Sequence, residues 1–200
     1  MASRFWDERF AQQHLVYGEE PNRFIRDAVD LPPGASIIDV GAGEGRNAVY
    51  LASLGYEVTA IDSSREGLAK LRRLADRRRV SVDVDLADVT TWAPERQWNG
   101  AIVTFLHLPS NDRPRLYRAI KTALRPGGRL FAEWFSPAQA LKGYASGGPP
   151  RADMMISADE LRGHFDTSGI RLAEELIDEL DEGVHRGPAA LTRFIWEKPA

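Results

Sequence analysis

The sequence predicts an α/β protein with a three-layer αβα sandwich and a mostly parallel sheet. Short apolar runs of strand type alternate with helical segments between residues 36 and 135. Connecting helices of about ten residues or more allow the right-handed crossovers that join parallel strands. The last two strand-like runs, 172–182 and 190–199, are joined by a short turn-rich connection. That pair is therefore expected to form an antiparallel hairpin at one edge of the sheet.

The leader, residues 1–33, comes first. Phe5, Trp6 and Phe10 have helical spacing, and a second short helix is expected at 23–31. These aromatic side chains need a core to cover, so the leader is expected to form a helical cap on the same domain.

The remaining elements follow in alternation. Strands are expected at 36–40, 56–62, 80–88, 100–108 and 129–135, and helices at 46–55, 65–79, 113–124 and 158–169. Ser63 with Glu66, and Ser157 with Glu160, have the spacing of a capping box and predict two helix N-termini. The run 172–182 also permits a helix, because its acidic residues lower its strand propensity.

Composition limits the class of protein. Two hundred residues with 43% hydrophobic content suit a single domain over 1–200. We divide it into the cap 1–33, a cofactor-binding core 36–135, a substrate loop 136–156, and a C-terminal helix and hairpin 157–200. The net charge of −3 argues against a nucleic-acid partner, and the basic run 72–79 is expected to be a solvated helix face.

The sequence contains no cysteine, which excludes disulfides and cysteine-based zinc sites, and we expect no metal. It has no apolar run of membrane-spanning length and no signal-peptide core at its start. A cytoplasmic protein without a membrane partner is the expectation, as a monomer or a homodimer.

Three glycines follow the first strand and open the next helix. Gly41, Gly43 and Gly45 allow a tight turn and let a ligand lie against the backbone. The dinucleotide fingerprint needs its third glycine at position 46, which is Arg46 here. The spacing therefore argues against a nicotinamide-dependent oxidoreductase, which stays the weaker alternative; a purely steric role for the glycines is also open.

Acidic residues end the next two strands. Asp62, 21 residues after Gly41, can accept both hydroxyls of a ribose, although a helix-capping role would also explain it. Asp88 can accept the exocyclic amine of adenine, although an aspartate in a turn is the more common explanation. Three ligand-facing features at three successive strand ends favour a cofactor site.

The segment "IIDVGAGEGRNAVYLASLGYEVTAIDSS", with "LADV", "FLHL" and "LRPGGRLFAEWF" downstream, resembles the class I S-adenosylmethionine-dependent methyltransferases. The flanks "FWDERFAQQHLVYGEEPNRFI" and "DEGVHRGPAALTRFIWEKP" are most similar to the small tellurite-resistance-type members. The resemblance implies a Rossmann-like seven-stranded sheet with an antiparallel last strand, S-adenosyl-L-methionine as cofactor, S-adenosyl-L-homocysteine as product, and N-terminal helices that cover the cofactor.

Together with the strand-end positions, the resemblance yields an expected cofactor-binding set: Asp39, Gly41, Ala42, Gly43, Gly45, Arg46, Asn47, Asp62, Ser63, Asp88, Val89 and Phe105. In this set Asp62 would bind the ribose and Asp88 the adenine. Arg46 would meet the methionine carboxylate, or be an exposed helix residue.

Two residues are candidates for the acceptor side. Tyr17, in the leader, would orient the methyl group or serve as a packed aromatic. His185, in the hairpin connection, would act as a base or bind substrate, or be a polar turn residue. His107 is expected to pack.

The acceptor is expected to be a small molecule. Relatives that methylate nucleobase amines carry an asparagine-proline-proline-aromatic motif after the fourth strand, and this chain has "TFLHLPS" there. We therefore expect methyl transfer to an oxygen, sulfur or other heteroatom. The alternative from a different class is a cofactor-binding protein that is regulatory and does not catalyse methyl transfer.

Overall fold

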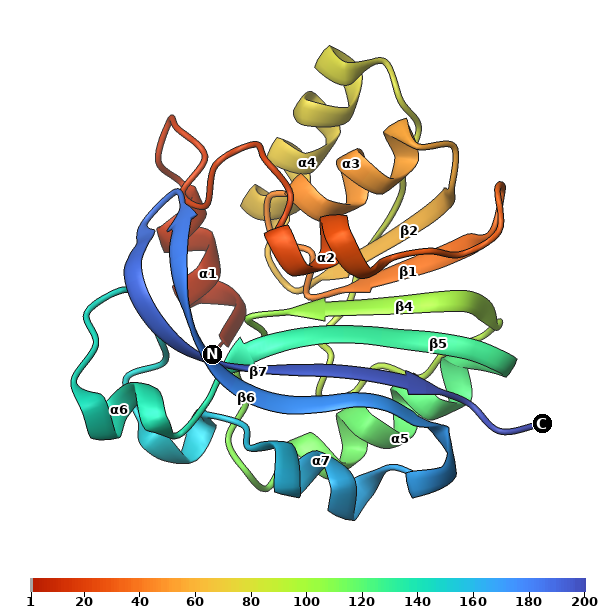
Figure 1. Cartoon of the computed structure of the whole chain (residues 1–200). Helices are drawn as coiled ribbons and strands as arrows, with labels where there is room; N and C mark the ends of the chain where they lie inside the picture. Colours follow the sequence, from red (N-terminus) through yellow and green to blue (C-terminus); the bar gives the residue numbers. More distant parts are fainter. Residues whose placement is uncertain (1) are drawn as a thin grey trace.

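The structure is a computed structural model that describes residues 2–200, with side chains from residue 4 onward. Seven strands form one sheet in the order β3-β2-β1-β4-β5-β7-β6 (Figure 1). The strands are β1 Ser36–Val40, β2 Glu57–Asp62, β3 Asp83–Leu86, β4 Trp98–Thr104, β5 Leu124–Phe135, β6 Ile170–Glu182 and β7 His185–Glu197. Strands β1 to β5 pair in parallel, and β7 is antiparallel to both β5 and β6. The predicted architecture, with its antiparallel last strand, is confirmed.

Helices cover both faces of the sheet (Figure 1). They are α1 Ala2–Phe10, α2 Arg23–Ala28, α3 Arg46–Ser53, α4 Arg65–Arg78, α5 Arg113–Ala123, α6 Ala138–Lys142 and α7 Ala158–His164, with 3₁₀ turns η1 Ala152–Met154 and η2 Thr167–Gly169. Successive residues of β1 serve opposite faces, because strand side chains alternate. Ile37 packs in the core under α2, α3 and α4, and Ile38 packs in the core under α5 and α7.

The run 172–182 is a strand, as expected, and its helical alternative is excluded, because β6 pairs along its length with β7. Two other local expectations need correction. The third strand is only Asp83–Leu86, since it is an exposed edge strand with one neighbour. The N-cap of α4 is Ser64 and not Ser63: the Ser64 hydroxyl accepts the Gly67 N–H at 3.0 Å.

Two further local expectations hold. Ser157 caps α7 by accepting the Glu160 N–H at 3.1 Å. The basic run 72–79 exposes its arginines while Leu71 and Ala75 of α4 are buried. Among residues 2–200, no helix is long and apolar enough to cross a membrane.

The segment 136–156 is not a structureless loop, because it contains α6 and η1. The buried Gln139 side chain donates to the Ser146 hydroxyl at 3.0 Å and to the Gly147 carbonyl at 2.8 Å, and accepts the Ala190 N–H at 2.8 Å. These bonds attach the segment to the start of β7.

Candidate active site

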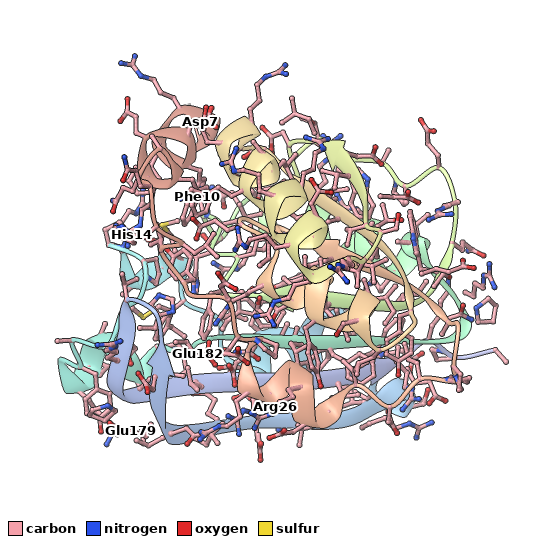
Figure 2. All side chains as sticks on the ribbon, turned by 90° about the horizontal axis from the view of Figure 1, so that it is seen from above. Asp7, Phe10, His14, Arg26, Glu179 and Glu182 are labelled. Atoms are coloured by element: carbon pink, nitrogen blue, oxygen red, sulfur yellow. The ribbon has the colours of Figure 1, made fainter. Side chains whose placement is uncertain are left out.

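The carboxyl ends of β1, β2, β4 and β5 meet at one edge of the sheet, where α1 and the tip of the β6–β7 hairpin also lie (Figure 1). Ligands of open α/β sheets bind at this edge. Asp7 and Phe10 of α1, labelled in Figure 2, lie over the start of α4. Asp7 accepts the Ser64 hydroxyl at 2.6 Å, and Phe10 is only 2% exposed. The leader thus covers the turn between β1 and α3.

The glycine turn has a backbone conformation that other residues rarely adopt. Gly41, Gly43 and Gly45 have φ values of 78°, 55° and 86°. The Gly41 N–H donates to the Ile61 carbonyl at 2.9 Å, which joins the turn to β2. A Cβ on Gly45 would lie 2.2 Å from Leu71 Cγ, so this third glycine lets α4 pack closely.

Two carboxylates flank the glycine turn. Asp39 is 1% exposed, and neither of its oxygens has a hydrogen-bond partner among the described residues. Burial, with a contribution from the charge of Asp62, raises the pKa of Asp39 to about 7. Asp62 accepts the N–H groups of Gly43 and Ser64, both at 2.8 Å, and burial raises its pKa as well.

The predicted residues Arg46 and Asn47 are buried at the start of α3. Arg46 pairs with Glu182 of the hairpin at 2.7 Å. Asn47 accepts the Asn22 N–H at 2.8 Å and donates to the Thr104 hydroxyl at 2.9 Å. Both side chains are therefore held, and Arg46 is not an exposed helix residue.

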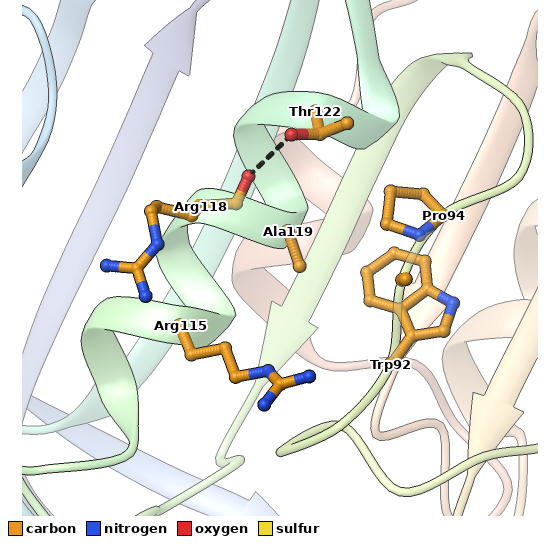
Figure 3. Close-up of a pocket in the computed structure, with 7 residues that line it drawn as sticks. Trp92, Pro94, Arg115, Arg118, Ala119 and Thr122 are labelled. Atoms are coloured by element: carbon orange, nitrogen blue, oxygen red, sulfur yellow. Dashed lines mark hydrogen bonds between the residues drawn. The ribbon is translucent and has the colours of Figure 1, made fainter.

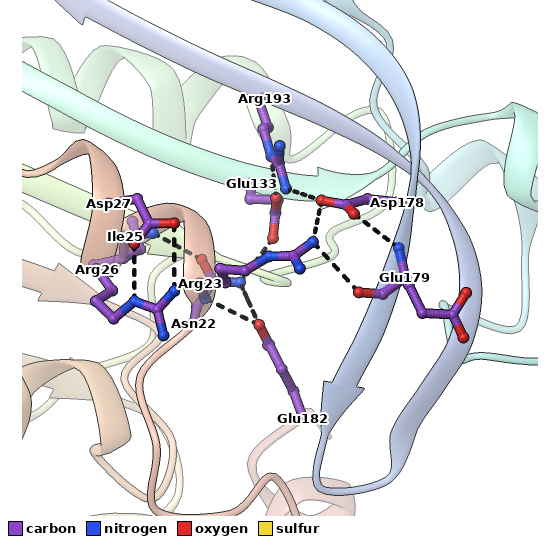
Figure 4. A network of polar contacts seen from close by, with 10 residues as sticks. All are labelled: Asn22, Arg23, Ile25, Arg26, Asp27, Glu133, Asp178, Glu179, Glu182 and Arg193. Carbon is purple, nitrogen blue, oxygen red and sulfur yellow. Dashed lines mark hydrogen bonds and ion pairs between the residues drawn. The ribbon is translucent and has the colours of Figure 1, made fainter.

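A polar network ties the leader to β5, β6 and β7 (Figure 4). The Asn22 amide donates to Glu133 at 2.7 Å, and Glu133 pairs with Arg193 at 2.6 Å. Burial raises the pKa of Glu133, and the hydrogen bond from Arg193 opposes that shift. Asp178 pairs with Arg193 at 2.7 Å and also with Arg23.

Glu44 is a site residue that the sequence patterns did not identify. It is 4% exposed, accepts the N–H groups of Val16 and Tyr17 at 2.8 and 3.3 Å, and pairs with Lys70 at 2.7 Å. Lys70 also donates to the His14 carbonyl at 2.6 Å. An acidic residue inside a glycine turn was the only signal in the sequence, and it does not reveal contacts with the leader.

The remaining predicted cofactor residues have different surroundings. Asp88 is exposed and accepts the Thr90 N–H at 2.9 Å, and the Thr90 hydrogen bonds lower the pKa of Asp88. This is the turn role that was the alternative for Asp88, and its second oxygen remains open to another donor. Val89 is buried, and Ala42 packs against the core under α2, α3 and α4.

Five rings form what we call the aromatic cluster: Tyr17, Phe105, His107, Phe135 and His185. Ring centroids are 4.9 Å apart for Tyr17–His185, Phe105–His185 and Phe105–Phe135, and 5.7 Å apart for the stacked pair His107–Phe135. The structure therefore brings the two acceptor-side candidates, Tyr17 and His185, into direct contact. Phe105 has φ of 51°, which is strained for a bulky residue and is typical of functional sites.

Both imidazoles of the cluster are neutral at pH 7. Burial lowers the pKa of His107 to about 4 and that of His185 to about 3. His107 Nδ1 donates to the Met154 carbonyl at 3.1 Å, which leaves Nε2 as an acceptor. Within residues 2–200, His107 Nε2 and His185 Nδ1 are buried without a hydrogen-bond partner.

A surface groove of about 390 Å³ lies between the β3–β4 connection and α5 (Figure 3). Trp92 and Pro94 form one side and Arg115, Arg118 and Thr122 the other. None of the predicted site residues line it, so it is separate from the candidate site. No cluster of three metal-ligating side chains occurs among the residues that the structure describes.

Comparisons with known proteins bear on this site. Residues 37–128 match the family described as "Methyltransferase domain". The chain is 36% identical over 137 residues to the ubiquinone biosynthesis O-methyltransferase of Xanthomonas axonopodis pv. citri, which covers 66% of this chain and 56% of that protein. The chain thus spans about half the length of this curated relative.

Two solved structures share the fold. TehB from Haemophilus influenzae superposes with a TM-score of 0.72 at 18% identity, over 98% of this chain and 66% of that one. The N-methyltransferase NodS from Bradyrhizobium japonicum, in complex with S-adenosyl-L-homocysteine, has a TM-score of 0.72 at 13% identity over 99% and 98%. At these identities the likeness concerns the fold.

Proposed function

We propose that this chain, which has the fold of the class I S-adenosylmethionine-dependent methyltransferases, transfers a methyl group from S-adenosylmethionine to a heteroatom of a small molecule. The observation that carries the proposal is the buried Asp39, without a hydrogen-bond partner among the described residues, beside the left-handed glycine turn. A buried carboxylate without a partner is costly, and a ligand with hydrogen-bond donors would satisfy it.

The residues present fit this cofactor. A carboxylate has about four acceptor positions, so Asp62 can bind ribose hydroxyls while it keeps the Gly43 and Ser64 N–H groups. Gly41 and Gly43 have no side chains, so a ligand would lie against the backbone of the turn once Leu106 and Phe10, which now lie over these two glycines, move aside. Arg46, once separated from Glu182, would meet the methionine carboxylate.

When bound, S-adenosylmethionine supplies a methyl group that its sulfonium charge already activates. The chain then has to hold the acceptor in line with that group and exclude water. Phe105 and Phe135 would exclude water, and Tyr17 would orient the acceptor through its contact with His185. Neutral His185 is a weak base, so accepting a hydrogen bond from the acceptor is its stronger role.

Calorimetric titration tests the cofactor part of the proposal. S-adenosylmethionine, S-adenosylhomocysteine and NAD are titrated separately, and the first two are expected to saturate. Binding of NAD alone would favour the oxidoreductase, and binding of none would overturn the proposal. Binding of S-adenosylmethionine without transfer of its labelled methyl group to a broad acceptor panel would favour the non-catalytic alternative.

A further inference from the structure

The aromatic cluster offers faces and edges of rings to a ligand. Phe105 and His185 meet edge to face at 73°, and His185 and Phe135 do so at 88°. Aromatic pairs at these distances attract beyond simple burial. A flat ring that takes a place among them finds partners on several sides.

The two imidazoles of the cluster each offer a hydrogen-bond acceptor without a matching donor. His107 Nε2 is buried and carries no proton, because Nδ1 donates to Met154. A neutral imidazole always offers one acceptor nitrogen, so His185 offers one too. An O–H or N–H donor would satisfy the two acceptor nitrogens, whereas an anion would satisfy neither and could accept only from the one N–H of His185.

The two nearby arginines leave the imidazole rings of the cluster uncharged. Arg46 is neutralised by Glu182 at 2.7 Å. The Arg9 guanidinium lies 5.9 Å from the centroid of the Tyr17 ring and contacts the leader side of the cluster. Both arginines further lower the pKa of His185, which keeps its ring neutral.

Two glycines form the outer wall of the cluster. Gly147 and Gly148 have φ of 134° and 121°, and a Cβ on Gly147 would lie 2.5 Å from His185 Cδ2. Side chains fill the cluster in this structure, so an acceptor would enter only when the Gly147–Gly148 wall or Tyr17 moves aside. Any side chain at position 147 would collide with the His185 ring.

We infer that the acceptor is an aromatic hydroxyl compound, whose ring packs against Phe105 and Phe135 and whose hydroxyl donates to an imidazole nitrogen of His185. The inference rests on the proposed function. In the transfer, an O–C bond forms from the hydroxyl oxygen as the C–S bond breaks, with its electron pair left on sulfur. The hydroxyl proton passes to His185 and then to water. An oxygen that carries both the methyl group and the proton is strongly acidic, so a weakly basic imidazole suffices.

A matched pair of probes tests the inference. 4-Methylphenol and 4-methylcyclohexanol share shape and hydroxyl group but differ in aromaticity, and selenite serves as a small oxyanion. With S-adenosylhomocysteine present, 4-methylphenol is expected to bind roughly tenfold more tightly than 4-methylcyclohexanol by ligand-observed NMR. Equal binding of the two alcohols, no saturable binding of 4-methylphenol, or binding of selenite alone overturns the inference.

Variants locate the binding. Phe105→Leu is expected to weaken the binding of 4-methylphenol about three- to tenfold. Phe5→Leu, at an exposed aromatic residue of α1, is expected to leave that binding unchanged. Wild type is expected to bind 4-methylphenol more tightly than its methyl ether, 4-methylanisole, which has no hydroxyl proton to donate. His185→Phe keeps a ring and removes the nitrogens, so it should abolish this preference. Calorimetry with S-adenosylmethionine on the same samples tests the proposed function separately. If the cofactor binds normally but neither Phe105→Leu nor His185→Phe changes the binding of 4-methylphenol, this inference is refuted and the proposed function is not.

Discussion

Arg46 and Glu182 form an ion pair of 2.7 Å in which each side chain is only 9% exposed. The pair joins the helix after the glycine turn to the tip of the β6–β7 hairpin. The methionine carboxylate of the proposed cofactor would compete with Glu182 for the same guanidinium.

Removing Glu182 tests this competition. Glu182→Ala leaves a buried guanidinium without its carboxylate, which is expected to cost about 3 kcal/mol of unfolding free energy. S-adenosylmethionine should restore part of that loss by pairing with Arg46. In urea titrations it should therefore stabilise Glu182→Ala more than it stabilises the wild type. Glu179→Ala, at an exposed position of β6, is the control. Equal stabilisation of variant and wild type by the cofactor would remove Arg46 from the carboxylate site.

Asp62→Ala is expected to weaken cofactor binding by about 1.5–3 kcal/mol, because hydrogen bonds to a charged group are lost. Calorimetric titration measures the change, and Asp76→Ala, an exposed aspartate of α4, controls for charge. An unchanged titration would show that Asp62 does not bind the ribose. Since Asp62 also accepts two N–H groups of the turn, urea unfolding of Asp62→Ala shows how much of the loss is structural.

His185→Ala is expected to lower turnover more than cofactor affinity, because the ring contacts Tyr17 and Phe105 on the acceptor side. Steady-state kinetics with a methyl acceptor, paired with calorimetry, separates the two effects. Equal losses in both measurements, or no loss in either, would contradict an acceptor-side role.

Asp39 makes stability depend on pH. Its pKa rises from 3.8 to about 7 on folding, so the folded state keeps a proton that the unfolded state loses above pH 4. The contribution of Asp39 to the free energy of unfolding is therefore fully present below pH 4 and is lost as the pH rises toward 7. Asp39→Asn removes that dependence, so its stability relative to wild type should rise by about 2–3 kcal/mol between pH 5 and pH 8.

Urea unfolding without cofactor at pH 5, 6.5 and 8 measures this difference. Asp83→Asn, at an exposed position of β3, should follow the wild-type curve. Curves of wild type and Asp39→Asn that stay parallel would mean that Asp39 titrates normally.

A comparison of Gly45→Ala with Gly55→Ala separates the cost of a left-handed backbone from the cost of a Cβ that collides with a neighbour. Both glycines have left-handed φ, 86° and 88°, and each alanine should cost about 1–2 kcal/mol in unfolding free energy for that reason. Only Gly45 lies against Leu71, whereas a Cβ on Gly55 meets nothing within 4 Å. Gly45→Ala should therefore lose about 1–3 kcal/mol more in urea titrations. Equal losses would mean that α4 adjusts freely.

The periodicity of the sequence predicted the layers and the edge hairpin, because burial on both faces of a parallel sheet produces continuous apolar runs. It overestimated the length of the third strand. The run 80–88 has a strand-like composition, but β3 lies at the edge of the sheet and pairs only with β2. Ser63 has the capping-box glutamate three residues later, yet the cap of α4 is its neighbour Ser64, which the backbone of the turn after β2 decides.

The candidate site was predictable where neighbouring elements build it. Asp39 lies on β1, the glycines follow in the next turn and Asp62 ends the adjacent β2, so their spacing indicated a common edge. Glu44, Glu182 and Phe135 belong to contacts between segments far apart in the sequence. No local pattern in a single chain predicts that Glu44 accepts the backbone of Val16.

The leader contacts both halves of the site: Phe10 lies over Gly43, and Tyr17 lies against His185. Glu44 and the Asn22 network hold the leader in this position. If the proposed function holds, release of the used cofactor and entry of a new acceptor would both require the leader to move, and the rate of that motion would set an upper limit on turnover.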